Sequence, residues 1–151
     1  PHPATGAVQR AARETFLARA SGAWAEPRGA WGLRFSGDLG ALSEDAAGAA
    51  LRALGRPYDH LFMRDNTNLY CAELIYEAFR EANGGDELFT LSPMHFGAPE
   101  SAEHRTWATY YEQRGAAVPQ GEPGISPLGV YLQARRLGAA PISPSGAITA
   151  S

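Results

Sequence analysis

The chain of 151 residues contains no lysine, because all 13 of its basic residues are arginine. This absence excludes a lysine general base and a lysine Schiff base. The chain has one cysteine, Cys71, so no disulfide can form within it and the fold does not depend on an oxidising compartment. A single cysteine also argues against a structural zinc site, which usually takes several cysteine ligands.

Long apolar runs and basic clusters are also missing. No apolar run is long enough to span a membrane, and no signal-peptide pattern is present. Because the chain opens on Pro1 without an initiator methionine, we expect a processed or truncated product, and the compartment stays unknown. The net charge of −3 and the absence of a basic stripe argue against a nucleic-acid partner.

The composition that is present is that of an ordinary globular protein, with 44% hydrophobic and 19% charged residues. The length predicts a single domain over residues 1–151. Residues 119–127 are rich in proline and glycine, so we expect an extended segment that wraps over the core or lines a groove. The polar residues from Pro141 onward resemble a low-complexity tail.

Several secondary-structure elements can be predicted from pattern and capping signals. Ser43 is expected to cap a helix that ends near Gly55. Residues 8–20 are ambiguous, because their first half fits an edge strand and their second half resembles a short helix. The other expected elements are a strand at 31–35, an extended segment at 58–63, a short helix at 14–20 and a short aromatic helix that carries Trp107, Tyr110 and Tyr111.

The strongest helix pattern covers residues 69–82. Tyr70, Leu74 and Ala78 form one apolar row at four-residue spacing, and Cys71, Ile75 and Phe79 form the next. Acidic residues and Arg80 occupy the other side, and Gly84-Gly85 end the helix. The pattern therefore predicts that Cys71 lies on the core-facing side in the first turn of this helix, with its stem against the core and its sulfur at the rim of the helix terminus.

The position of Cys71 fits two interpretations. It follows the polar, turn-prone residues 64–68 and stands where unpaired N–H groups and the helix dipole favour a thiolate, which is the nucleophilic form. A free cysteine is also among the most frequently buried residues, so a packing role fits equally well. Position alone does not decide between them.

Other catalytic chemistries have little support. The four histidines, His2, His60, His95 and His104, show no metal-ligand spacing, so no metal and no organic cofactor are expected. Phosphate-loop, dinucleotide and Gly-x-Ser-x-Gly patterns are absent. Cysteine with histidine remains the nucleophile–base pair that the sequence supports.

Two blocks of the sequence carry a resemblance. The first reads Gly55-Arg56-Pro57-Tyr58-Asp59, and the second reads Leu69-Tyr70-Cys71-Ala72-Glu73-Leu74-Ile75-Tyr76. Their order and spacing resemble the YiiX/YebB-like cysteine hydrolases, circularly permuted relatives of the NlpC-type cell-wall peptidases. Ala72 stands where that family usually has serine. Residues 92–96, 107–111 and 118–127 also resemble one branch of it, so that the resemblance extends over residues 14–127.

The resemblance implies an α+β, papain-like fold whose nucleophile, Cys71, begins a core helix packed on a small antiparallel sheet. It also implies a catalytic histidine on a strand upstream of the cysteine, in a Ser-His-Val-Gly-like motif that this chain lacks. By this alignment the histidine-bearing strand lies before Pro1. His2 then lies near the polar position that orients the histidine.

Three interpretations follow. The chain is part of an active enzyme whose histidine strand is cut off or carried by a separate N-terminal segment. Alternatively, His2 or His60 supplies the base in a rearranged site. In the third interpretation the chain is a non-catalytic module that binds a ligand in the groove of the former enzyme.

The remaining expectations concern residues around the nucleophile. By resemblance, Tyr58 lies beside Cys71 and contacts substrate. Asp59 is expected to brace the loop before the helix, and Glu73 to fix the helix start through an arginine or a backbone amide. The implied function is hydrolysis of a cell-wall peptide amide, or of an ester or acyl bond, through a cysteine acyl-enzyme. The resemblance also implies a bacterial cell-envelope or secreted setting.

Overall fold

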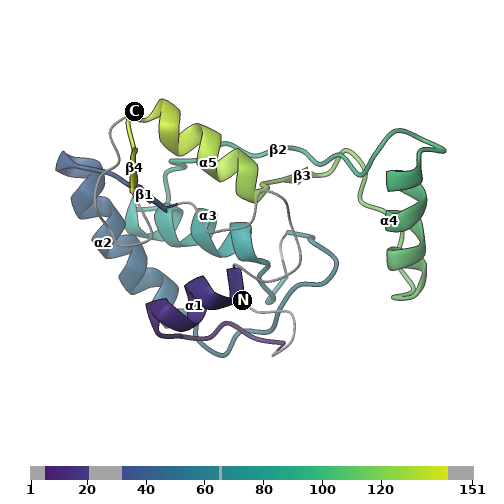
Figure 1. Ribbon diagram of the computed structural model, residues 1–151, viewed down its shortest axis with the longest axis horizontal. Coiled ribbons are helices and arrows are strands. Elements are labelled where there is room, and N and C mark those ends of the chain that lie inside the picture. Colours follow the sequence, from purple (N-terminus) through teal and green to yellow (C-terminus); the bar gives the residue numbers. More distant parts are fainter. Residues whose placement is uncertain (1–5, 21–31, 65, 143–151) are drawn as a thin grey trace.

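The computed structural model describes residues 6–20, 32–64 and 66–142 (Figure 1). His2, which the sequence analysis named as a candidate site residue, lies outside these described residues. In chain order the elements are α1 (Arg13–Ala20), β1 (Gly32–Arg34), α2 (Gly37–Arg52), α3 (Cys71–Ala82), β2 (Ser92–Pro93), α4 (Ala102–Glu112), β3 (Pro123–Gly124), α5 (Pro127–Arg136) and β4 (Ala140–Ile142).

Helix α3 lies in the middle of the molecule and packs against α2 and α5 (Figure 1). Helices α2 and α3 meet through small side chains, since Ala46 and Ala49 of α2 and Ala78 of α3 are buried in one cluster. Small residues at a contact let two helices approach closely. A second cluster, around Tyr76 and Phe89 at 1% exposure each, joins α3 to α5.

Two small antiparallel sheets connect segments that are distant in sequence. Strand β1 pairs with β4, and β2 pairs with β3. In Figure 1, β2 and β3 run side by side from the body of the molecule toward α4. The hydroxyls of Tyr110 and Tyr111 donate to the carbonyl oxygens of His60 and Leu61, both at 3.0 Å, and fix α4 to the loop that precedes α3.

Most of the predicted helices and the predicted strand are confirmed. Helix α3 covers all but the first two residues of the predicted span, and α1, β1 and α4 lie in the segments where a helix, a strand and an aromatic helix were expected. Ala7, immediately before the ambiguous segment, forms an isolated antiparallel bridge with Pro57. The expected extended segment over 119–127 is extended only in part, because the chain turns at Gln120 and Gly121, forms β3 and enters α5 at Pro127.

Ser43 does not cap a helix, so that prediction is wrong. Helix α2 begins at Gly37 after Ser36, and the Ser43 hydroxyl donates to the carbonyl oxygen of Leu39 at 2.8 Å inside the helix. Serine can satisfy its hydroxyl in this way within a helix, so its presence alone does not mark a helix start.

The extended segment predicted at 58–63 is also wrong beyond its first residue. Tyr58 forms an isolated parallel bridge with Leu69, but the chain then bends and Phe62 has φ +55°. The cause is Asp59, whose carboxylate accepts hydrogen bonds from the N–H groups of Leu61 and Met63 and closes the chain into a turn. Of the residues from Pro141 onward, Pro141 and Ile142 belong to strand β4, and the rest of the expected tail lies outside the described residues.

Candidate active site

Cys71 is the first residue of α3, and its side chain is exposed. The prediction that Cys71 lies on the core-facing side of the helix is wrong, whereas an exposed sulfur at the helix start agrees with the second part of that prediction. Ile75, one turn further along the same row, is 40% exposed, whereas Glu73 is only 5% exposed. The sulfur of Cys71 is therefore accessible at the start of the helix, as a nucleophile must be.

The start of α3 is held by two hydrogen bonds of Tyr70, the residue before Cys71. The Glu73 carboxylate accepts the backbone N–H of Tyr70 at 3.4 Å. The Tyr70 hydroxyl accepts the backbone N–H of Ile125 at 3.1 Å. Because that hydroxyl is engaged with Ile125, the Tyr70 side chain makes no cap hydrogen bond to α3 within the described part of the chain. The N–H groups of the first turn can then face an anionic atom beside the Cys71 sulfur.

Glu73 is buried at this helix start with few partners. Burial raises the pKa of its carboxyl from 4.5 to about 7, while the Tyr70 N–H and the more distant Arg64 act in the opposite direction. A carboxylate out of water is costly to ionise, and one hydrogen bond does not offset that cost here. The protonation state of Glu73 is therefore linked to the hydrogen bond that fixes the start of α3, the helix that carries Cys71.

Asp59 braces the loop that leads to α3. Its side chain is 2% exposed, and its oxygens accept the N–H groups of Leu61 at 2.8 Å and Met63 at 2.7 Å. The amide of Asn66 donates to it at 3.3 Å. Three donors on one buried carboxylate fix the turn that places Phe62 above Tyr70, with ring centroids 5.6 Å apart.

Tyr58 and His60 lie together on the same loop. Their rings meet edge to face with centroids 4.8 Å apart. Burial raises the pKa of Tyr58 to about 12, and the negative charge of a Cys71 thiolate nearby adds to the rise. Tyr58 is therefore a neutral hydroxyl near Cys71, able to donate or accept one hydrogen bond.

A groove of about 440 Å³ opens beside Cys71. It is walled by the loop before α3, by the two strands of the β2–β3 sheet with their flanking residues, and by α4. Its lining residues are Phe62, Tyr70, Cys71, Ser92, Pro93, Met94, His95, Phe96, Glu103, Trp107, Gly124, Ile125, Ser126 and Pro127.

One histidine of the described chain lines this groove, and sequence reasoning gave it no site role. His95 accepts the N–H of Gly97 through Nδ1 at 3.2 Å. In a neutral ring with Nδ1 as acceptor, the proton is on Nε2, so that nitrogen donates and cannot accept a thiol proton. His60 and His104 do not line the groove, and His104 Nδ1 is buried without a hydrogen-bond partner among the described residues.

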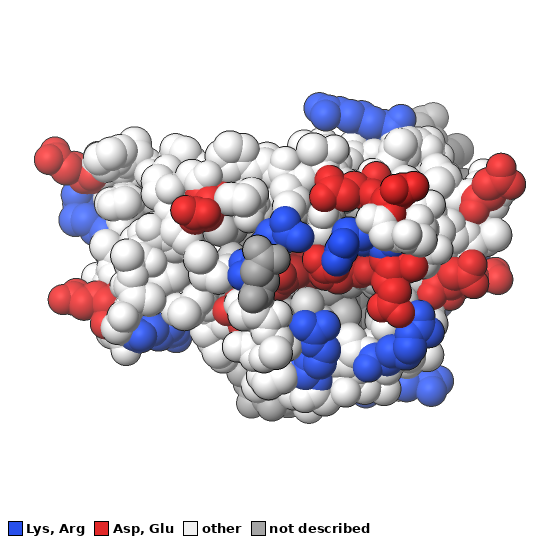
Figure 2. Space-filling model, turned by 180° about the vertical axis from the view of Figure 1, so that it is seen from behind, with Lys and Arg blue, Asp and Glu red and all other residues white. Residues whose placement is uncertain are grey.

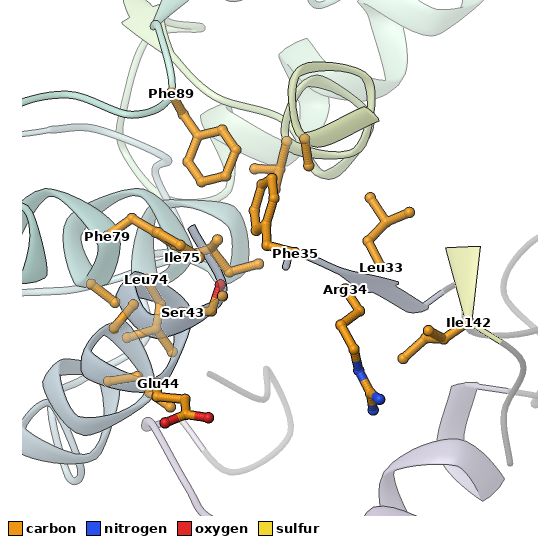
Figure 3. Close-up of a pocket in the computed structure, with 17 residues that line it drawn as sticks. Leu33, Arg34, Phe35, Ser43, Glu44, Leu74, Ile75, Phe79, Phe89 and Ile142 are labelled. Atoms are coloured by element: carbon orange, nitrogen blue, oxygen red, sulfur yellow. The ribbon is translucent and has the colours of Figure 1, made fainter. Parts of the chain in front are cut away.

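A larger hollow of about 840 Å³ lies on another side of α3 (Figure 3). Apolar side chains such as Phe35, Ile75 and Phe79 line most of it, with residues of α2 and α3 on one side and of β1 and β4 on the other. Ser43, Arg34 and Glu44 are its polar lining residues. Its lining lacks cysteine and histidine, whereas Cys71 and His95 both line the smaller groove.

The described residues limit the other site types. They contain no group of three or more His, Cys, Asp or Glu side chains arranged to hold a metal ion. No helix among them is both long and apolar enough to cross a membrane. Figure 2 shows acidic and basic side chains interspersed on one face, without a continuous basic stripe.

Comparison with known proteins agrees with this geometry. A family model described as permuted papain-like amidase enzymes, YaeF/YiiX, C92 family, matches residues 33–132. The chain therefore belongs to this family of amidase enzymes. The family model includes Cys71, α3 and every wall of the groove. A search of curated proteins gave no match.

The fold is also similar to that of a solved protein. A crystal structure of the metalloprotein YiiX from Escherichia coli O157:H7 superposes with a TM-score of 0.52 at 21% sequence identity. The match covers 68% of this chain and 54% of that one, so this chain spans about half the length of YiiX. The predicted α+β, papain-like fold and the predicted family are confirmed.

Proposed function

We propose that this chain hydrolyses amide bonds with Cys71 as the nucleophile. The observation that carries the proposal is the exposed Cys71 at the first residue of α3, opening into a groove inside a permuted papain-like amidase domain. A packing role would bury the side chain, and Cys71 is not buried. The larger apolar hollow has no comparable nucleophile.

The proposed reaction has two steps. The Cys71 thiolate bonds to the carbonyl carbon, and the carbonyl oxygen becomes an oxyanion facing the N–H groups at the start of α3. The tetrahedral intermediate collapses, the C–N bond breaks, and the amine leaves with a proton from the general acid. Water, deprotonated by the same group, then attacks the thioester and releases the carboxylate and the thiolate.

The general acid and base is proposed to be a histidine outside the described residues, on a separate or preceding N-terminal segment. Two features support this assignment. His95 presents a protonated Nε2 when Gly97 donates to its Nδ1, and His60 packs on Tyr58 away from the groove lining. His2 is the alternative within these 151 residues.

The proposed substrates are small peptide amides, with cell-wall peptides as the leading class by family resemblance and acyl esters as the alternative. The groove walls are largely aromatic or apolar, with Phe62, Phe96 and Trp107 among them. Such walls suit an acyl group flanked by apolar atoms. A bacterial envelope setting belongs to the same proposal.

The test is turnover of a fluorogenic peptide amide by a form of the chain extended at its N-terminus, which supplies the proposed histidine, and by variants of that form. Cys71→Ser is expected to lower kcat/KM by about 100-fold or more. The matched control is Ile75→Ser, the next exposed residue on the same row of α3, which should keep its activity. Activity that survives in Cys71→Ser would place the chemistry elsewhere.

A second candidate function is a groove-binding module without turnover. The observation that favours it is the Nδ1 acceptor role of His95, which leaves Cys71 without a base among the described residues that line the groove. Saturable peptide binding together with no turnover, both in this chain and in a form extended at its N-terminus, would support the module.

A further inference from the structure

The Cys71 groove has an uneven charge. Of the described residues that line it, Glu103 is the one carboxylate, and none is arginine. The remaining ionisable side chains of its lining are His95, Tyr70 and Cys71 itself. A substrate in this groove therefore meets one fixed negative charge and no fixed positive side chain.

Glu103 has no partner of its own among the described residues. Two glutamates of α3 are paired with arginines, Glu81 with Arg52 at 2.7 Å and Glu77 with Arg80 at 2.9 Å. Glu103 makes no ion pair or side-chain hydrogen bond with any residue in the described ranges. Its charge is thus available to a ligand and is not neutralised within the protein.

Trp107 lies beside Glu103 on the same face of α4. The two residues are four positions apart, which places their side chains one above the other, and both line the groove. Trp107 is held by rings at defined distances, with centroids 5.2 Å from Phe96 and 6.0 Å from Phe62. A carboxylate next to an indole is a combination that attracts ammonium and guanidinium groups.

Helix α4 gives this pair a fixed position. Its first turn is capped by the Ser101 hydroxyl, which accepts the N–H of His104 at 3.0 Å, and its far end is tied to the loop before α3 through Tyr110 and Tyr111. The positive end of the helix dipole carries about half an elementary charge. It offsets only part of the Glu103 charge, so this wall stays negative.

We propose that the wall formed by Glu103 and Trp107 is a cation subsite, which selects amide substrates carrying an ammonium or guanidinium group and disfavours substrates with a carboxylate there. The reacting carbonyl lies at Cys71, and the cationic group lies toward α4. The inference rests on the proposed function for its substrate class. Its charge preference can be measured without turnover.

The single cysteine provides the first test. Cys71 is treated at about pH 8, where an ordinary imidazole is neutral, with matched methanethiosulfonate reagents that carry an ammonium, no charge or a sulfonate. The ratio of ammonium to sulfonate rates reports the local charge, because the thiolate fraction cancels. Glu103→Gln is expected to lower this ratio about threefold at low salt, and salt should shrink the effect.

The matched control is Glu112→Gln, which removes the same charge at the last residue of α4, away from the groove lining. It should leave the rate ratio of the wild-type chain nearly unchanged. An equal ratio in Glu103→Gln and wild type would overturn the proposal, as would an equal fall in both variants, which would reflect net charge alone.

The second test measures ligands through protection of Cys71. Acetyl-Ala-X-Ala amides with X as lysine, acetyl-lysine or glutamate compete with alkylation by iodoacetamide. The lysine peptide should protect at about fivefold lower concentration than the acetyl-lysine peptide, and Glu103→Gln should remove the difference. Equal protection by all three peptides, or none, would overturn the subsite. Neither result depends on hydrolysis, so loss of the cation subsite and loss of the amidase proposal remain distinguishable.

Discussion

The buried carboxyl of Glu73 makes stability depend on pH in a direction opposite to that of most acidic residues. Its pKa is raised to about 7, chiefly by burial, against 4.5 for an ordinary glutamate. The folded chain therefore holds this proton more tightly than the unfolded chain. Stability is unaffected where both states are protonated, falls as pH rises from about 4.5, and reaches its low plateau above about pH 7.

The size of this effect follows from the two pKa values. Between about pH 5 and pH 8 the folded state should lose about 2.5 kcal/mol through Glu73 alone. Glu73→Gln keeps an oxygen that can accept the N–H of Tyr70 but cannot ionise. We expect the variant to resemble wild type near pH 5 and to exceed it by about 2.5 kcal/mol near pH 8.

The assay is urea unfolding of wild type and Glu73→Gln at several pH values. Titration of the histidines contributes equally to both proteins and cancels in their difference. The control is Glu81→Gln on the same helix, whose exposed pair with Arg52 should be worth less than about 1 kcal/mol at every pH. A wild-type minus Glu73→Gln difference that does not change with pH would refute the assigned burial of this carboxyl.

Three further predictions concern the groups that hold the site. Asp59→Ala should cost about 2–4 kcal/mol in urea unfolding because three donors lose their acceptor, and Asp59→Asn should cost less; equal, small losses would contradict this account. Tyr70→Phe should lower stability by about 1–2 kcal/mol by leaving the Ile125 N–H unpaired, and an unchanged midpoint would argue against that bond. Phe89→Ala, at a side chain 1% exposed, should cost about 3–5 kcal/mol, whereas the exposed Leu128→Ala should cost less than about 1 kcal/mol.

The elements that the sequence predicted well are those with local signals. Helix α3 follows from its four-residue rows and its Gly84-Gly85 stop, and α4 follows from its aromatic spacing. The prediction of which side of α3 faces the core was wrong at two positions, since Glu73 is buried and Ile75 is exposed. From its polarity alone, a glutamate is expected on the solvent side of a helix. Here Glu73 is buried, because it accepts the N–H of Tyr70 and because α3 packs with this side inward.

The groove was largely invisible in the sequence because it is built from separate segments. Cys71, Met94, Trp107 and Gly124 become neighbours through the β2–β3 pairing and the attachment of α4, both long-range contacts. The aromatic spacing of α4 was the available signal for its wall. No sequence signal indicated that Glu103 is unpaired, because ion pairing depends on which arginines the fold brings near each glutamate.

The buried charged side chains among the described residues, Asp59 and Glu73, both lie at the approach to Cys71. Burying a carboxyl costs free energy unless hydrogen bonds compensate, so neither is expected from stability alone. Asp59 is compensated by three donors that shape the loop, while Glu73 is compensated by one donor at the helix start. These two buried carboxyls thus fix the backbone that carries Cys71, the proposed nucleophile. That arrangement is expected of a site that must hold N–H donors and a thiolate in one geometry.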